Sequence, residues 1–169
     1  MFKLAKKILK VALTVITLVI VIDVISKPPS VYDSSGESGT RDSLAILNAA
    51  KEYLGASYQA GAREPPYRFD CSGLVSQAYL DAAGISIPRN SSQIWAQGKK
   101  IDDHSVQPGD IIVFGERGTP NHVAIYIDET SMIHSASSGT ETGVVISRQD
   151  ENYWSQRFMG YVTFMSNIK

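Results

Sequence analysis

The chain has 169 residues, 43% of them hydrophobic and 20% charged, with a formal net charge of −1, which fits one globular domain and a segment left over. Residues 41–169 carry 11 basic and 14 acidic side chains, and no basic run alternates with aromatic residues. This composition lacks the electrostatic signature of nucleic-acid-binding proteins, so we expect no nucleic-acid partner.

The first 26 residues have the pattern of a targeting segment. Lysines at four positions between 3 and 10 precede an uncharged apolar run over residues 11–22. As a helix this run would cover about 18 Å, less than a bilayer core of about 30 Å. A signal peptide and a single-span membrane anchor over residues 1–26 are both compatible with it, and the poor cleavage site at Val24 and Ser26 favours the anchor. Either one exports the rest of the chain, whereas a buried core helix fits poorly with the lysines.

Residues 27–40 read KPPSVYDSSGESGT, a composition typical of a flexible linker. The folded domain is predicted over residues 41–169. Apolar residues at helical spacing predict its first helix over 44–54, with Gly55 at the end. A loop over 56–69 follows.

A second helix is expected to begin at Cys71 and to end before Gly84, and a short helix follows over 92–97. From residue 111 onwards the pattern changes to short runs of β-branched and aromatic residues. These runs predict strands at 111–114, 122–127, 132–137, 144–148 and 158–164. Helices followed by strands predict an α+β fold, with N-terminal helices packed on a central antiparallel sheet of about five strands.

Cys71 is the single cysteine, and it stands at the start of the second predicted helix. A lone cysteine cannot form a disulfide within the chain, so an oxidising compartment would leave it free. The positive end of a helix dipole favours thiolate, and thiolate is the nucleophile of covalent catalysis by cysteine. The alternative is a small buried core residue, and the local sequence favours neither.

Two histidines, His122 and His134, stand in consecutive predicted strands that residues 128–130 connect. An odd number of connecting residues puts both imidazoles on one face of the sheet, whereas a two-residue turn puts them on opposite faces. On a common face they could meet the cysteine helix. Cys71 would then be the nucleophile, His122 the base and His134 the residue that fixes the tautomer of His122. The backbone N–H of Cys71 would stabilise the oxyanion.

Each histidine also has a structural interpretation, as a buried or strand-edge residue with its hydrogen bonds satisfied. Zinc is a further alternative, because one cysteine and two histidines could supply three ligands of an open site. Zinc ligands usually come in close pairs such as CxxC or HxxxH, and this chain has none. We therefore expect no metal and no cofactor, and we assign no role to His104, which stands in a polar loop.

Six short motifs follow one another along residues 44–164: DCSGLV at 70–75, IPRNS at 87–91, PGD at 108–110, HVAIY at 122–126, MIH at 132–134 and RFMG at 157–160. In this order and spacing they resemble the NlpC family of papain-like cell-wall cysteine peptidases. The resemblance is strongest to small single-domain murein endopeptidases of Gram-negative envelopes. It implies a papain-like version of the α+β fold.

The resemblance also implies roles for individual residues. Cys71, His122 and His134 would form the catalytic triad, and Tyr58 would line the site near the oxyanion. Four further residues would bind substrate: Asp70 and Ser72 at the amine end of the stem peptide, and Arg89 and Ser91 at the cleft. Each of these five binding residues has a structural alternative, which is core packing for Tyr58, a helix cap for Asp70, a first-turn position for Ser72 and turn positions for Arg89 and Ser91.

The sequence therefore predicts an exported, monomeric cysteine endopeptidase that cleaves amide bonds in the stem peptides or crosslinks of peptidoglycan. It would work in the cell envelope, either in the periplasm or on the outer side of the inner membrane, attached through the N-terminal segment if that segment is not cleaved. Two alternatives use the same cleft: a non-catalytic module that holds peptidoglycan, and an amidase or acyltransferase with the same triad.

Overall fold

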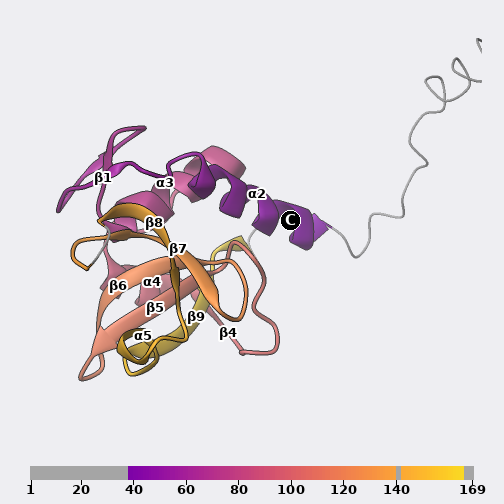
Figure 1. Cartoon of the computed structure of the whole chain (residues 1–169). Helices are drawn as coiled ribbons and strands as arrows, with labels where there is room; N and C mark the ends of the chain where they lie inside the picture. The colour runs from indigo at the N-terminus through magenta and orange to yellow at the C-terminus, as the bar shows by residue number, and fades with distance from the viewer. Residues whose placement is uncertain (1–37, 140–141, 166–169) are drawn as a thin grey trace, which may run out of the picture. The chain divides into compact units, whose positions relative to one another are not determined.

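The computed structural model describes residues 38–139 and 142–165 (Figure 1). The predicted targeting segment over 1–26 lies outside the described residues, as does the predicted linker except for residues 38–40, which belong to the first described helix. No helix in the described part of the chain combines the length and the apolar character that a bilayer span requires.

The described residues form four helices and nine strands. In chain order these are α2 (Ser38–Lys51), β1 (Ser57–Tyr58), β2 (Arg63–Glu64), β3 (Arg68–Phe69), α3 (Cys71–Ala83), α4 (Ser91–Gln97), β4 (Lys99–Ile101), β5 (Ile111–Glu116), β6 (Thr119–Tyr126), β7 (Ser131–Ala136), β8 (Gly143–Arg148), α5 (Asn152–Ser155) and β9 (Phe158–Thr163).

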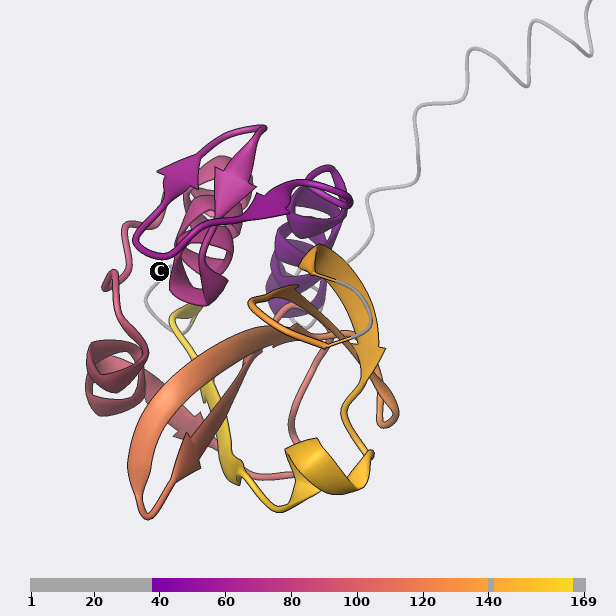
Figure 2. The same cartoon turned by 60° about the vertical axis from the view of Figure 1, so that its left-hand side comes forward.

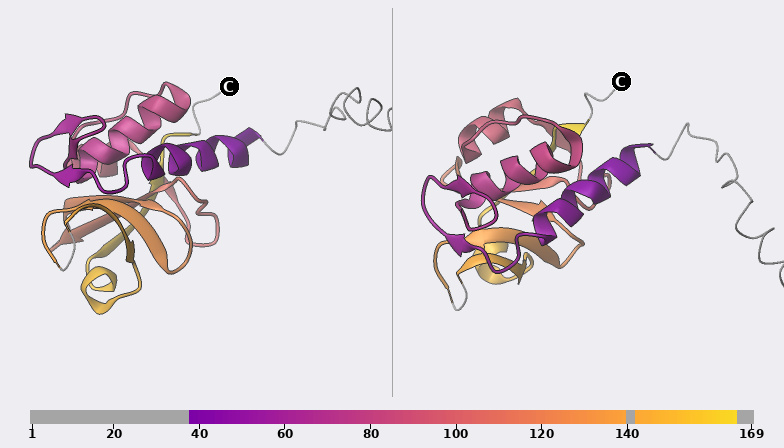
Figure 3. Two further views of the ribbon diagram at one scale, coloured as in Figure 1. Left: turned by 45° about the horizontal axis from the view of Figure 1, so that its top comes forward. Right: turned by 90° about the horizontal axis from the view of Figure 1, so that it is seen from above.

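The main sheet has six strands in the order β4-β9-β5-β6-β7-β8, and every neighbouring pair is antiparallel. Helices α2 and α3 lie along one face, and the short helix α5 lies on the opposite side of the sheet (Figure 3). A small three-stranded sheet, β1-β3-β2, lies beside the start of α3 (Figure 2). This arrangement confirms the predicted α+β class.

The strands bury side chains on both faces of the main sheet, because successive residues of a strand point to opposite sides. In β5, Ile111 and Val113 face the core under α2 and α3. Ile112 and Phe114 belong to a second apolar cluster, which the Trp154 side chain of α5 covers. The second cluster lies on the sheet face that also carries His122, because His122 pairs with Phe114 in the ladder.

Several elements differ from the sequence-based expectation. The predicted loop over 56–69 contains the short strands β1, β2 and β3, and the helix α5 was not predicted. The first helix starts at Ser38 and ends at Lys51, because the amides of Tyr53 and Leu54 bond to carbonyls three residues back and tighten the chain into turns. The sheet has a sixth strand, β4, which pairs with β9. This strand is short and carries two exposed lysines, so it shows no alternation of apolar and polar residues that the sequence could reveal.

Helix α3 begins at Cys71, as predicted, because Asp70 caps it. The Gly73 N–H donates to Oδ1 of Asp70 at 2.6 Å, and Gly84 ends the helix in a left-handed conformation with φ 66°. The helix is buried from Ser72 to Tyr79 and packs on α2, β6 and β7. Its N-terminus, which carries Cys71, is thereby fixed next to the main sheet.

Gly73 makes a close approach that gives a test of this helix start. A Cβ at this position would lie 2.2 Å from the carbonyl oxygen of Ala62. An ordinary helix is more stable with alanine than with glycine at an interior position, by about 0.5–1 kcal/mol. Here we expect the opposite sign, with Gly73→Ala lowering the free energy of unfolding by about 1–3 kcal/mol in urea denaturation, because the helix start must move. A stabilised variant would contradict the close packing of α3 against the loop before it.

Candidate active site

The pairing of β6 with β7 places the two predicted histidines together. Ile125 pairs with Ile133 and Tyr126 with Met132, so the five residues 127–131 connect the paired positions. The odd number confirms the predicted common face. The expectation that α3 covers this face is wrong, because Ala124 of the same face belongs to the cluster under Trp154, whereas Cys71 and α3 pack on the cluster of the other face. Nε2 of His122 lies 2.8 Å from Nδ1 of His134, and the two rings are nearly perpendicular at 85°. The imidazoles therefore share one hydrogen bond.

The second ring nitrogen of His134 is bonded as well, to a residue that the sequence analysis missed. Nε2 of His134 lies 3.0 Å from Oγ of Ser147 on β8. His134 pairs directly with Val145, and Ser147 stands two residues further along β8, on the same face. A serine in a strand carries no signal of such a role until the pairing register of the strand is known.

The Trp154 side chain packs against both histidine rings, and the sequence analysis missed this residue too. Its ring centroid lies 5.0 Å from that of His122 and 5.1 Å from that of His134. The Phe114 ring packs against the Trp154 ring, with 4.8 Å between the ring centroids. Trp154 stands in the four-residue helix α5 between two strands, which is too short to show a helical period in the sequence.

Both histidines are neutral at neutral pH. Burial, and secondarily the neighbouring His134, lowers the pKa of His122 to about 3. Burial lowers the pKa of His134 to about 4. Desolvation disfavours the charged imidazolium, and two imidazoles in contact cannot both carry a charge at low cost. The pair therefore offers a proton acceptor that stays deprotonated well below neutral pH.

Cys71 is half-buried at the first position of α3. The backbone N–H of Val123, the β6 residue that follows His122, lies close enough to the thiol to lower its pKa. Burial raises the pKa of the Cys71 thiol, and this effect outweighs the opposite effect of the amides of Val123 and of the first helix residues. The expected thiolate at the helix start is thus wrong for the resting protein, because desolvation is stronger than the helix dipole.

Three of the predicted binding residues form one hydrogen-bonded cluster at the start of α3. Nη1 of Arg89 donates to Oδ1 of Asp70 and to Oγ of Ser72, both at 2.7 Å, and Ser72 Oγ donates to the carbonyl of Arg89 at 2.8 Å. The Gly61 N–H donates to Oδ2 of Asp70 at 2.9 Å. Asp70 is therefore a helix cap, as the structural alternative expected, and it also carries an ion pair.

The remaining two predicted residues lie on either side of this cluster. Tyr58, on β1, is half-buried; burial raises the pKa of its phenol, and the charges of Cys71 and Asp70 raise it further, so the phenol lies near both. Oγ of Ser91 donates to the carbonyl of Pro120 at 3.2 Å. This bond ties the first residue of α4 to the strand that carries His122, two residues before it.

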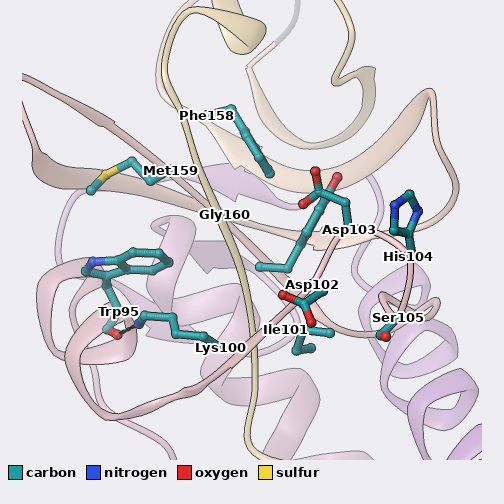
Figure 4. Close-up of a pocket in the computed structure, with 11 residues that line it drawn as sticks. Trp95, Lys100, Ile101, Asp102, Asp103, His104, Ser105, Phe158, Met159 and Gly160 are labelled. Carbon is teal, nitrogen blue, oxygen red and sulfur yellow. Dashed lines mark hydrogen bonds between the residues drawn. The ribbon is translucent and has the colours of Figure 1, made fainter.

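A hollow of about 660 Å³ lies elsewhere on the sheet, along the edge formed by β4 and β9 (Figure 4). Trp95, Phe158 and Tyr161 line it together with Asp102, and Cys71 and the histidine pair do not. His104, which has no role assigned from the sequence, is exposed and lines this hollow. Across the described ranges 38–139 and 142–165, no three His, Cys, Asp or Glu side chains are grouped to hold a metal ion.

The contact of Trp154 with both imidazoles predicts a change in their titration. In Trp154→Ala, water should reach the pair, and the pKa of each imidazole should rise into the range of about 5–6.5. NMR titration of the imidazole protons measures this directly. Ser155→Ala is the matched control, because Ser155 is exposed on the same helix. Unchanged titration of His122 in Trp154→Ala would show that Trp154 does not shield the pair.

Known proteins contain the same domain. The sequence model of the NlpC/P60 family matches residues 55–163. Gamma-DL-glutamyl hydrolase of Bacillus subtilis (strain 168) is 33% identical over 123 residues, which are 72% of this chain and 29% of that protein. Murein DD-endopeptidase MepS/Murein LD-carboxypeptidase of Escherichia coli (strain K12) is 29% identical over 113 residues, which are 67% of this chain and 58% of that protein. The chain thus spans less than two thirds of the length of either relative.

The fold is similar to solved structures as well. The crystal structure of an NlpC/P60 family protein from Bacillus cereus superposes with a TM-score of 0.66 at 30% sequence identity, over 73% of this chain and 40% of that one. The segment that the family model matches, residues 55–163, contains Cys71, both paired histidines and all strands from β1 to β9. The chain belongs to the NlpC/P60 family.

Proposed function

We propose that this protein is a peptidoglycan hydrolase, a cysteine endopeptidase that cleaves amide bonds in the stem peptides or crosslinks of murein. The observation that carries the proposal is the 2.8 Å contact between His122 and His134, with the Cys71 thiol at the amide of the next residue of the same strand. The relatives named as a murein endopeptidase and a glutamyl hydrolase support this substrate class.

The first half of the reaction is acyl transfer to the thiol. Nδ1 of His122 takes the thiol proton while Sγ of Cys71 attacks the carbonyl carbon of the amide. The carbon–nitrogen bond then breaks, and the same proton passes from His122 to the leaving amine. Since the thiol is protonated and His122 is neutral at rest, proton transfer accompanies the attack rather than preceding it.

The second half is hydrolysis of the thioester. Water gives a proton to Nδ1 of His122 and attacks the thioester carbon. The carbon–sulfur bond then breaks, and the sulfur receives that proton, so the free thiol and a carboxylic acid product result. In both halves His134 holds His122 through Nε2 and leaves Nδ1 for the proton.

Negative charge that develops on the carbonyl oxygen meets donors at the start of α3. The first amides of a helix have no partner within the helix, and the amides of Cys71 and Ser72 lie close enough to the thiol to lower its pKa. Tyr58 adds a phenol that stays protonated at neutral pH, because its pKa is raised by burial and by its neighbours Cys71 and Asp70. These donors would form the oxyanion site.

The cluster behind the thiol suits the amine end of a peptide. Oδ1 of Asp70 accepts bonds from Gly73 and Arg89, whereas Oδ2 accepts one from Gly61. A carboxylate oxygen can accept about two hydrogen bonds, so Oδ2 keeps room for an ammonium group. Asp70 would bind that group with Ser72 beside it, while Arg89 and Ser91 shape the cleft.

The proposal extends to location. Residues 1–26 would export the chain to the cell envelope and, if not cleaved, hold it at the membrane. The segment 27–37 would then connect the anchor to a monomeric peptidase domain that begins with α2 at Ser38.

Cleavage of purified muropeptides by the full-length protein tests this function, and mass spectrometry of the products identifies the bond that is cut. We expect Cys71→Ala and His122→Ala each to lower kcat/KM by about 10⁴-fold or more, because each removes one member of a unit that acts together. His104→Ala, on an exposed loop, should keep wild-type activity, and circular dichroism should show the same fold for all variants.

Three outcomes would contradict the proposal. Undiminished hydrolysis by Cys71→Ala would exclude the thiol as the nucleophile. Wild-type protein that binds muropeptides and releases no product would instead be a binding module built on the same fold. Products from transfer to an added amine, in place of hydrolysis, would identify an acyltransferase.

A further inference from the structure

Ser147 ends a chain of three side chains that starts at the proposed base. His122, His134 and Ser147 are joined by contacts of 2.8 Å and 3.0 Å across the three neighbouring strands β6, β7 and β8. His134, in the middle, is 1% exposed, and both of its ring nitrogens are used in this chain. The inference below rests on the proposed function, in which His122 accepts the thiol proton.

The tautomer of His134 decides whether His122 can act as a base. A neutral imidazole has one N–H and one lone pair. If His134 carries its proton on Nε2, it donates to Ser147, and Nδ1 accepts the Nε2–H of His122, which leaves a lone pair on Nδ1 of His122. If His134 carries its proton on Nδ1, it donates to Nε2 of His122, and Nδ1 of His122 then holds a proton and can accept none.

Among the three linked side chains of His122, His134 and Ser147, only Ser147 can both donate and accept through the same atom. It is half-buried on β8, a strand at the edge of the main sheet, and its neighbours Ile146 and Arg148 are exposed. The hydroxyl proton can therefore turn toward solvent while a lone pair of Oγ faces His134. A buried Nε2–H without that acceptor would be left unpaired, which is costly.

We propose that Ser147 is a positioning residue: its hydroxyl accepts the Nε2–H of His134 and so keeps the lone pair of His122 on Nδ1, the nitrogen that takes the thiol proton. Ser147 itself touches neither the thiol nor the substrate in this scheme. It acts through His134 alone, so it should affect the chemical step and leave substrate binding unchanged.

The variants Ser147→Thr and Ser147→Val test the hydroxyl, because threonine and valine have nearly the same shape and differ in that one group. Both residues are favourable in a strand. In muropeptide cleavage by the full-length protein, we expect Ser147→Val to lower kcat about three- to tenfold, the worth of one neutral hydrogen bond, with KM within about twofold. Ser147→Thr, which keeps the hydroxyl, should stay within about twofold of wild type in both constants. Equal kcat for the two variants would overturn the proposal.

NMR of the ring nitrogens gives a second readout that does not depend on activity. Long-range proton–nitrogen correlation on histidine-labelled, full-length protein reports which nitrogen of each ring is protonated. We expect Nε2–H for both His122 and His134 in wild type and in Ser147→Thr, and an Nδ1–H form of His134 in Ser147→Val. An Nδ1–H form of His134 in the wild type, or the same tautomer in all three proteins, would overturn the proposal.

The two readouts keep the inference separate from the proposed function. If the wild type cleaves no muropeptide, the proposed function fails, and the ring tautomers still decide whether Ser147 orients His134. If the wild type cleaves and the Val variant keeps both its kcat and its tautomer, the function stands and Ser147 has no positioning role.

Discussion

The contact between Nε2 of His122 and Nδ1 of His134 is the interaction on which the rest of the site depends, and the register of β6 against β7 determines it. A slip of one residue would move one imidazole to the other face of the sheet. Ile125 and Ile133, which pair directly, are fully buried in the core under α2 and α3, so a slip would also expose the core. The same apolar residues that stabilise the sheet thus keep the two imidazoles together.

A second feature of the site is that the buried histidines are hydrogen-bonded to a serine and not to a carboxylate. The linked side chains of His122, His134 and Ser147 are all neutral, whereas a carboxylate in the third position would stabilise an imidazolium. Trp154 covers the pair. Burial, and to a lesser extent the charge of Asp70, raises the pKa of Cys71. At rest Cys71 is therefore a thiol and both histidines are neutral imidazoles, and in the proposed reaction charge develops only as the reaction proceeds.

Much of this architecture is visible in the sequence, because it depends on local signals. The cap at Asp70 and the stop at Gly84 delimit α3, and short runs of β-branched and aromatic residues mark the strands that carry His122 and His134. Other features depend on tertiary structure and have no local signal. Ser147 becomes a partner of His134 only through the β7–β8 register, and Trp154 reaches both imidazoles from a single helical turn. The predicted thiolate failed for the same reason, since desolvation of Cys71 comes from segments distant in the sequence.

The pH dependence of alkylation of Cys71 by iodoacetamide tests the neutral resting state most directly. The chain contains a single cysteine, so the rate reports one thiol. Because burial raises the thiol pKa, we expect little reaction at neutral pH and a single rise with a midpoint above the ordinary value of about 8.5. A rapid, pH-independent rate between about pH 4 and 7 would reveal a thiolate paired with an imidazolium and would contradict the account.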